Sequence, residues 1–324
     1  LYTGRHKIIT RYRSFHGATA GALALTGDPY RLPVEPLMPG VVHVLDPYCY
    51  RCPFGWTKET CRRECISHVE QVIQFEGPER IAAIVLEGVT VSNGLIIPPD
   101  EYWPSMRHIC DKYGILLVSD EVMSGFGRTG EWFGVDHWGV EPDIITMGKG
   151  ITSGYVPLGG VIVSRAISEH FATRRLPMGL TNSGHPLGVA AGVAAIEVYK
   201  EERLVETSKE MGAVLRAGLD ELKAEHPSVG DVRSIGLFST IELVKARATK
   251  EPLAPLPGLP SSPQDAEVAP RLSAALRERG MHCFVKWNHL FPIPPLCINE
   301  SQISDGLHIL NDVLDIADKV AADS

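Results

Sequence analysis

A carboxylate and an amine each follow a short apolar run near the middle of the chain. Asp120 comes after residues 114–119 (GILLVS), and Lys149 comes after residues 144–148 (IITMG). Short runs rich in Ile, Leu and Val are typical of buried parallel strands. In an open parallel sheet, groups at the carboxyl ends of neighbouring strands meet at one ligand-binding crevice. A lysine and an aspartate that meet there suit pyridoxal phosphate, because the lysine forms a Schiff base with the cofactor and the aspartate pairs with its pyridine nitrogen.

The residues around this pair also carry a family resemblance. Residues 120–130 (DEVMSGFGRTG), together with the later Lys149, resemble the signature of class III aminotransferases, also called omega-aminotransferases. The resemblance covers nearly all of the chain and is strongest from about 81 to 186. Within the family, residues 87–99 (EGVTVSNGLIIPP) and 284–296 (FVKWNHLFPIPPL) are most similar to the taurine-pyruvate branch.

The resemblance implies a catalytic and cofactor-binding role for the central pair. Lys149 would hold the cofactor and move a proton between substrate and cofactor, which requires the lowered pKa that burial supplies. Asp120 would keep the pyridine nitrogen protonated, since opposite charges about 4 Å apart at an effective dielectric near 20 interact by roughly 4 kcal/mol. Val122 would contact one face of the cofactor ring, although an ordinary core position explains it almost as well.

Two segments outside this motif complete the expected cofactor site. Phe15 and His16 match an aromatic-His-Gly turn of the family, in which the aromatic ring stacks on the other face of the cofactor; judged alone, His16 reads as structural. Glu87 ends a buried apolar run and corresponds to a family glutamate beside the cofactor. Gly88 stands where the family usually has proline, which loosens the local turn.

Two further residues concern the phosphate and the substrate. The resemblance implies that Thr181 reaches across a homodimer interface to the partner's phosphate site. The alternative is an N-cap for the following helix, and both roles can be true together. Many family members bind a substrate carboxylate with an arginine of the C-terminal domain. Lys286 occupies the matching stretch here and keeps the charge without the fork geometry, which leaves affinity for alpha-carboxylates open.

The elements that must position these residues alternate between strand and helix. Strands are expected at 7–13, 41–45, 81–87, 115–120, 144–147 and 158–164, and helices at 59–75 and 100–113. Later in the chain, residues 183–187 open an Ala-rich helix that reaches about 201, and further helices are predicted over 204–225 and 303–321. A strand is predicted over 232–245 and a Pro-rich surface loop over 249–264. This alternation favours an α/β fold with a mostly parallel sheet sandwiched by helices. The resemblance implies a fold-type I transferase with a large cofactor domain at 1–200 and a smaller α+β domain at 201–324.

Bulk composition narrows the class of partner. The net charge of −8 and the lack of a long basic run argue against nucleic acid and anionic membrane surfaces. No apolar run approaches the 18 or so residues of a membrane span, and no signal peptide is visible, so a cytoplasmic location is expected. The chain starts at Leu1 inside an apparent helix-to-strand junction. We therefore expect roughly a hundred residues to be absent before it, including the turn that holds the cofactor phosphate.

Two motifs suggest other chemistry. Residues 125–130 (GFGRTG) fit a dinucleotide fingerprint, but residues 131–140 are glycine-broken and aromatic instead of opening an apolar helix. Four cysteines at short spacing could hold structural zinc, although similar loops in the taurine-like branch have no inferred zinc role, and we predict no metal. These cysteines are Cys49, Cys52, Cys61 and Cys65.

Together these observations predict a pyridoxal phosphate-dependent transaminase with a ping-pong mechanism. It would move an amino group from an amine or omega-amino acid, of taurine or beta-alanine type, to a 2-oxo acid such as pyruvate. Another cofactor chemistry on the same scaffold, such as decarboxylation or amino-group migration, remains open. A non-catalytic fragment and, more distantly, a nicotinamide dehydrogenase also remain.

Overall fold

The computed structural model describes residues 1–256 and 263–323. Contacts divide the chain into two units, the first formed by Leu1–Phe126 with Glu131–Arg203 and the second by Gly127–Gly130 with Leu204–Ser324. Each unit has its own sheet. Among the described residues, no helix is both long and apolar enough to cross a membrane.

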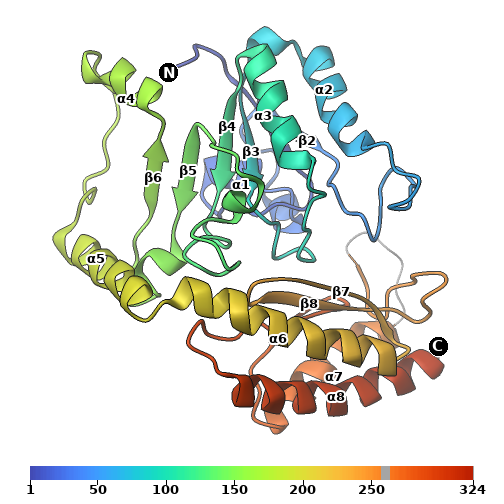
Figure 1. The fold of residues 1–324 in the computed structure, drawn as a ribbon. Coiled ribbons are helices and arrows are strands. Elements are labelled where there is room, and N and C mark those ends of the chain that lie inside the picture. Colours follow the sequence, from blue (N-terminus) through green and yellow to red (C-terminus); the bar gives the residue numbers. More distant parts are fainter. Residues whose placement is uncertain (257–262, 324) are drawn as a thin grey trace. The chain divides into compact units, whose positions relative to one another are not determined.

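The first unit is built on a six-stranded sheet in the order β2-β1-β3-β4-β5-β6 (Figure 1). Strands β1 to β5 are parallel, whereas β6 runs antiparallel to β5. The strands are β1 (Lys7–Arg11), β2 (Val41–Val44), β3 (Ile81–Glu87), β4 (Leu116–Asp120), β5 (Ile144–Met147) and β6 (Gly160–Val163). The predicted α/β class with a mostly parallel sheet is therefore confirmed.

Helices of the first unit shape a core against this sheet. They are α1 (Ala20–Leu25), α2 (Glu64–Glu76), α3 (Tyr102–Tyr113), α4 (Arg165–Ala172) and α5 (Pro186–Glu201), with short 3-10 helices η1 (Pro29–Val34), η2 (Pro78–Arg80), η3 (Gly134–Trp138) and η4 (Lys149–Thr152). Apolar residues of α2 and α3 pack with those of the strands, as in the cluster of Ile73, Trp103, Met106, Ile84 and Leu117. Burying such side chains stabilises the unit by roughly 1.5–3 kcal/mol for each large residue.

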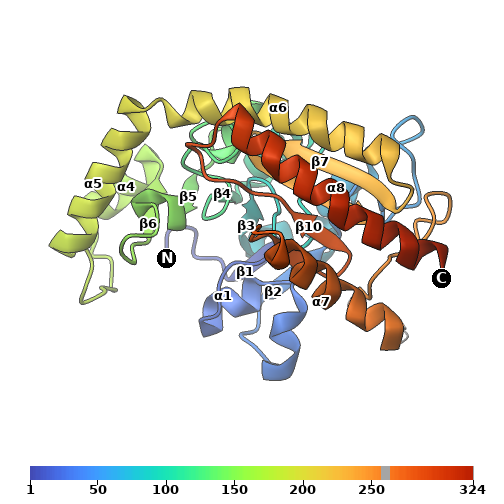
Figure 2. The same cartoon turned by 90° about the horizontal axis from the view of Figure 1, so that it is seen from below.

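The described residues of the second unit form an antiparallel sheet with three helices. The sheet has the order β7-β8-β10-β9, and in Figure 2 helices α6 and α8 lie side by side across it. The elements are α6 (Leu204–Glu225), β7 (Val229–Ile235), β8 (Phe238–Leu243), α7 (Pro263–Glu278), β9 (Phe284–Lys286), β10 (His289–Phe291) and α8 (Glu300–Ala322).

Three expectations about elements were wrong in detail. The helix expected from 59 begins at Glu64, after Arg63 in a left-handed conformation. The single strand expected over 232–245 is a hairpin, because the chain reverses at Gly236, whose φ is +54°. The expected loop over 249–264 ends in helix α7, which starts at Pro263; its central part, 257–262, lies outside the described residues.

Candidate active site

The carboxyl ends of three adjacent strands bring the central residues together. Glu87 ends β3 and Asp120 ends β4, and the two are direct partners in the parallel register. Asp120 is in turn paired with Thr146 of β5. Lys149 follows β5 and opens η4 with a φ of +41°, in the left-handed region. Side chains from strands far apart in the sequence therefore gather at one edge of the sheet.

Asp120 is held on both of its carboxylate oxygens. Oδ1 accepts a hydrogen bond from the backbone N–H of Val122 at 3.1 Å, and Oδ2 lies 2.7 Å from Nδ1 of His16. The other ring nitrogen of His16 lies 3.1 Å from Oγ1 of Thr10. The side chains of His16 and Asp120 are 3% and 8% exposed. The histidine of the predicted aromatic-His-Gly turn thus contacts the aspartate directly and fixes its orientation.

Glu87 is a buried carboxyl with two backbone donors. The N–H of Phe15 donates to Oε1 at 2.9 Å, and the N–H of Val91 donates to Oε2 at 3.3 Å. Burial raises the pKa of Glu87 to about 7, although the nearby His16 and the N–H of Phe15 act in the opposite direction. Arg11, itself buried, donates from Nη2 to the main-chain oxygen of Glu87 at 2.9 Å. Glu87 can therefore change its charge near neutral pH.

Lys149 presents an amine suited to nucleophilic chemistry. Burial lowers the pKa of Lys149, and the negative charges of Asp120 and Glu87 only partly counter this effect. An amine with a lowered pKa is more often uncharged and so more reactive toward a carbonyl. The side chain borders a cavity of about 520 Å³, lined by Thr152, Gly154, Val156, Pro157, Leu158 and Gly159.

The remaining residues of the expected ring site lie at the same strand ends. Val122 packs beside the residue before the lysine, since a Cβ added to Gly148 would lie 3.6 Å from one methyl of Val122. The ring of Phe15 meets that of Tyr30 edge-on, with centroids 6.3 Å apart. The backbone N–H of Val122 donates to Asp120, and that of Phe15 donates to Glu87, so both residues are linked to the central carboxyl groups.

Two predicted site residues stand outside this group of contacts. Thr181 lies in an exposed turn before α5. Lys286 ends β9 in the second unit, half-buried, with Nζ 4.3 Å from the ring centroid of Trp287.

The chemistry of the gathered residues fits pyridoxal phosphate. A nucleophilic amine borders a cavity, and a carboxylate oriented by a histidine lies at the same sheet edge. These are the groups that the cofactor needs for covalent attachment and for a charge partner at its ring nitrogen.

Comparison with known families agrees with this chemistry. The family model described as "Aminotransferase class-III" matches residues 2–314. The chain therefore belongs to the class-III aminotransferases, a family that uses pyridoxal phosphate. The predicted family is confirmed, and with it the fold-type I architecture.

Individual relatives are about two fifths identical to the chain over the residues that align. It is 38% identical to an uncharacterized aminotransferase, YhxA, of Bacillus subtilis, over 93% of this chain and 66% of that protein. It is 40% identical to a taurine–pyruvate aminotransferase of Bilophila wadsworthia, over 76% of this chain and 56% of that protein. The chain thus spans less than two thirds of the length of these curated relatives.

A solved structure extends the similarity to the whole fold. The taurine:2-oxoglutarate aminotransferase from Bifidobacterium kashiwanohense, solved in complex with PLP and glutamate, is 41% identical and superposes with a TM-score of 0.92. The match covers 98% of this chain and 71% of that chain.

The two alternative motifs do not build the sites that they suggested. The fingerprint-like segment is followed by the 3-10 helix η3 and not by an α-helix, so it lacks the helix N-terminus that would hold a pyrophosphate. No three of the four clustered cysteines bring their sulfur atoms within 4.8 Å of one another. Burial also raises the pKa of Cys65 to about 12, which works against the thiolate that zinc requires.

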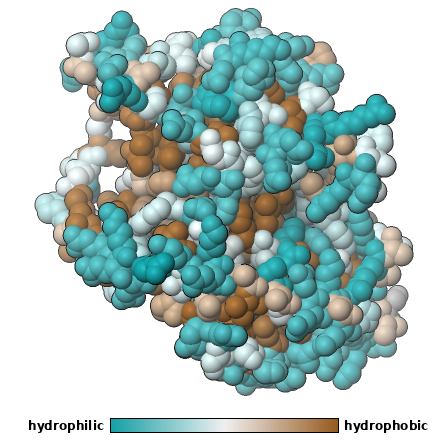
Figure 3. Space-filling view, viewed as in Figure 1, coloured by the Kyte–Doolittle hydropathy of each residue, from teal (hydrophilic) through white to brown (hydrophobic). Residues whose placement is uncertain are grey.

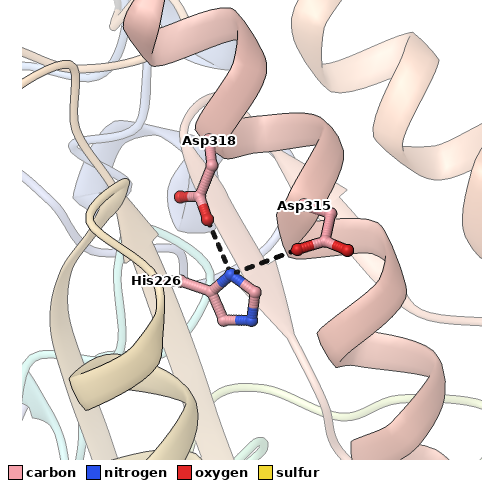
Figure 4. A group of neighbouring side chains, drawn as sticks. All are labelled: His226, Asp315 and Asp318. Atoms are coloured by element: carbon pink, nitrogen blue, oxygen red, sulfur yellow. Dashed lines mark hydrogen bonds and ion pairs between the residues drawn. The ribbon is translucent and has the colours of Figure 1, made fainter.

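Within the described part of the chain, one group of potential metal ligands does gather, in the second unit: His226, Asp315 and Asp318 (Figure 4). Both nitrogens of the His226 ring already face acceptors. Nδ1 lies 2.7 Å from Asp318 and Nε2 lies 3.0 Å from Oδ1 of Asn311. Burial opposes a charge on this ring, but these hydrogen bonds and both aspartates outweigh it and raise the pKa of His226. The group is therefore best described as an ion pair.

Sequence reasoning missed two residues that shape the site. Arg11 holds the main chain of Glu87, but it ends a short strand and belongs to no recognisable motif. Glu121 was read only as part of the signature around Asp120. Its position directly after a buried strand end was the available signal, because a carboxylate must find donors when it is buried.

Proposed function

We propose that this chain carries the catalytic centre of a pyridoxal phosphate-dependent aminotransferase. The observation that supports this most directly is the position of Lys149. Its amine has a lowered pKa and lies at the edge of the sheet where Asp120 and His16 form their hydrogen bond. In this proposal residues 1–200 form the cofactor domain and residues 201–324 form the small domain.

Each residue has a defined task in the proposed reaction. When bound, the cofactor supplies an electron sink for negative charge that develops on the substrate carbon. Lys149 would hold the cofactor through Nζ and later act as the base that moves the substrate proton. Asp120 would accept the hydrogen bond of the ring N–H and keep that proton in place. His16 would prevent the Asp120 carboxylate from rotating away, and Glu87 would border the ring with a carboxyl of adjustable charge.

Apolar and partner residues would complete the cofactor site. Val122 would contact one face of the ring and Phe15 the other. Thr181 would reach the phosphate of a second protomer, which makes a homodimer the active form.

Exposed apolar surface supports the homodimer. Apolar atoms gather over the edge strand β6 in Figure 3, where Val161 is 63% exposed. Helix α5 also exposes Leu187 and Val193. A surface of this kind is typical of an interface. We expect Val193→Glu to shift the protein from dimer to monomer in light scattering, with Lys112→Ala as an exposed control. A monomeric wild type would contradict the dimer.

The amino donor that we propose is taurine or beta-alanine, and the acceptor is a 2-oxo acid. The taurine donors named for two relatives support the first part. Their acceptors differ, pyruvate in one and 2-oxoglutarate in the other, so both acids need to be tested. Lys286 would bind the acceptor carboxylate as a point charge without a bidentate fork.

Another chemistry on the same residues is the alternative function. Decarboxylation and amino-group migration need the same lysine and aspartate. Product analysis with each donor separates them, because only transamination forms a new amino acid from the 2-oxo acid. A non-catalytic role would give no product from any donor.

The test of the proposed function is covalent trapping of the cofactor. Wild type, Lys149→Ala and Lys112→Ala are incubated with pyridoxal phosphate and then reduced with borohydride. We expect a stable adduct on the peptide that contains Lys149 in wild type and in Lys112→Ala, and none at that position in Lys149→Ala. An adduct on another lysine, with Lys149 unmodified, would overturn the assignment.

A further inference from the structure

Glu121 is a fully buried carboxylate whose two oxygens each accept two hydrogen bonds. Oε1 accepts from Oγ of Ser119 at 2.7 Å and from the N–H of Val135 at 2.9 Å. Oε2 accepts from Oγ of Ser124 at 2.6 Å and from the N–H of Gly134 at 2.7 Å. The carboxylate thus joins the end of β4, the residues that follow it and the start of η3.

The space around this carboxylate is closed by glycine. A Cβ added to Gly88 would lie 2.5 Å from Oε1 of Glu121, and a Cβ added to Gly134 would lie 2.8 Å from Cβ of Ser124. Real side chains do not tolerate contacts this short. Glu121 and its partner Ser124 can therefore keep these positions only because residues 88 and 134 are glycines. The position of the carboxylate is therefore narrowly defined.

Glu121 holds two segments, residues 122–126 and 131–135, and the lysine turn packs against the first of them. Val122 lies beside Gly148, the residue before Lys149, at the 3.6 Å given above. Phe126 lies against Gly150, the residue after it, because a Cβ at Gly150 would come within 2.8 Å of Cβ of Phe126. The rings of Phe126 and Phe133 meet edge-on at 5.8 Å and join the two segments.

Lys149 has a φ of +41°, a strained conformation for a residue with a side chain, and such strain persists only where the surrounding structure enforces it. We propose that Glu121 is a positioning residue for Lys149, because its four hydrogen bonds fix the segment on which the lysine turn rests and the second segment that packs against the first. This inference depends on the proposed function only for the role of the amine.

The test measures the amine of Lys149 directly in cofactor-free protein. Trinitrobenzenesulfonate modifies uncharged amines, and mass spectrometry of the peptide that contains Lys149 gives its rate at each pH. In Glu121→Gln the amide nitrogen faces two donors, so the segments loosen, the amine becomes more exposed and its titration midpoint rises. We expect the rate near pH 8 to fall about 3- to 10-fold, which corresponds to roughly half to one pKa unit.

The control is Ile73→Ala, which removes a buried side chain from α2, a helix that packs with α3 and β2, and so lowers stability in another part of the unit. In this variant the titration midpoint of the Lys149 amine is expected to equal that of wild type. Ser124→Ala removes one donor and provides a milder change in the same direction, which decides the question if Glu121→Gln does not fold. An unchanged midpoint in a folded Glu121→Gln, or an equal shift in Ile73→Ala, would overturn the positioning role.

The covalent trapping experiment keeps the two proposals apart. If wild-type Lys149 is not trapped with pyridoxal phosphate, the proposed function fails, whatever the titration of the variants shows. If it is trapped but its midpoint is independent of Glu121, the proposed function stands and the positioning role fails.

Discussion

The two units each contain a histidine that faces an aspartate at the same distance. Nδ1 of His16 lies 2.7 Å from Asp120, and Nδ1 of His226 lies 2.7 Å from Asp318. The surroundings differ. Nε2 of the first histidine faces the hydroxyl of Thr10, which can donate or accept, whereas Nε2 of the second faces the carbonyl oxygen of an asparagine, which only accepts.

We propose that these surroundings separate a structural pair from one that takes part in chemistry. His226 must donate from both nitrogens and is therefore held as a cation, with every partner in place. The pair of His16 and Asp120 instead lies beside two groups whose pKa values are shifted by burial. The pKa of Lys149 is lowered and that of Glu87 is raised, so both shifts favour the uncharged form. Perturbed groups that lie close together are typical of functional sites. A His–Asp pair alone therefore says little about function.

The largest expected difference between the pairs is in catalysis. Asp120→Asn keeps the shape of the side chain but removes the charge opposite the cofactor nitrogen, an interaction of roughly 4 kcal/mol. We expect kcat to fall by about 10³-fold, whereas Asp318→Asn leaves kcat unchanged. Steady-state rates with taurine and pyruvate, on protein shown to be folded by circular dichroism, measure both. Equal losses in the two variants would remove the functional distinction between the pairs.

The proximity of Asp120 and Lys149 could be predicted from sequence, because strand ends obey a simple rule. Asp120 and Lys149 each follow an apolar run, and parallel strands bring such positions together. The antiparallel direction of β6 and the turn at Gly236 could not be predicted from the sequence, since neither is fixed by local composition. The contact of His16 with Asp120 joins residues far apart in the chain, so only the folded sheet reveals it.

The second expected effect is a pH dependence of stability that originates at Glu87. Burial raises the pKa of this carboxyl from its ordinary 4.5 to about 7. The folded state therefore retains a proton that the unfolded chain releases, and the free energy of unfolding falls as the pH rises between these values. The total loss is on the order of 3 kcal/mol.

Urea unfolding from pH 4.5 to 8 tests this effect. Glu87→Gln cannot ionise, so wild type should lose stability relative to this variant across the interval. Glu210→Gln, an exposed position of α6, is the matched control and should run parallel to wild type. A constant difference between wild type and Glu87→Gln would show that Glu87 does not titrate in this range.

The third expected effect is a pH dependence of stability that originates at the pair of His226 and Asp318. The pKa of His226 is raised above its ordinary 6.5, so folding favours the cation. The charged groups that face the ring are Asp318 and Asp315, while Arg247 donates to the main-chain oxygen of His226 at 2.7 Å. The stability that the ring contributes is present below about pH 6.5 and is lost as the pH rises through the raised value.

His226→Gln measures this contribution. Hydrogen bonds to charged groups are worth about 1.5–3 kcal/mol, and we expect the variant to be less stable than wild type by that amount at pH 6. The difference should shrink toward pH 8.5, and kcat should be unaffected because the residue has no part in the proposed chemistry. A difference that grows with pH would mean that the ring is neutral in the folded state.

The smallest expected effect concerns binding of the acceptor carboxylate by Lys286, a residue that belongs to neither His–Asp pair. The amine of Lys286 lies over the ring of Trp287, so Lys286→Ala removes a positive charge without breaking a His–Asp pair. We expect KM for pyruvate to rise about 5-fold while kcat and KM for the amino donor change little, since a charge that remains partly open to solvent contributes roughly 1 kcal/mol. Lys286→Arg keeps the charge and adds a second donor, so it should retain the wild-type KM or lower it. If both variants match wild type, the acceptor carboxylate is bound elsewhere, and the charge that selects the 2-oxo acid must come from another residue.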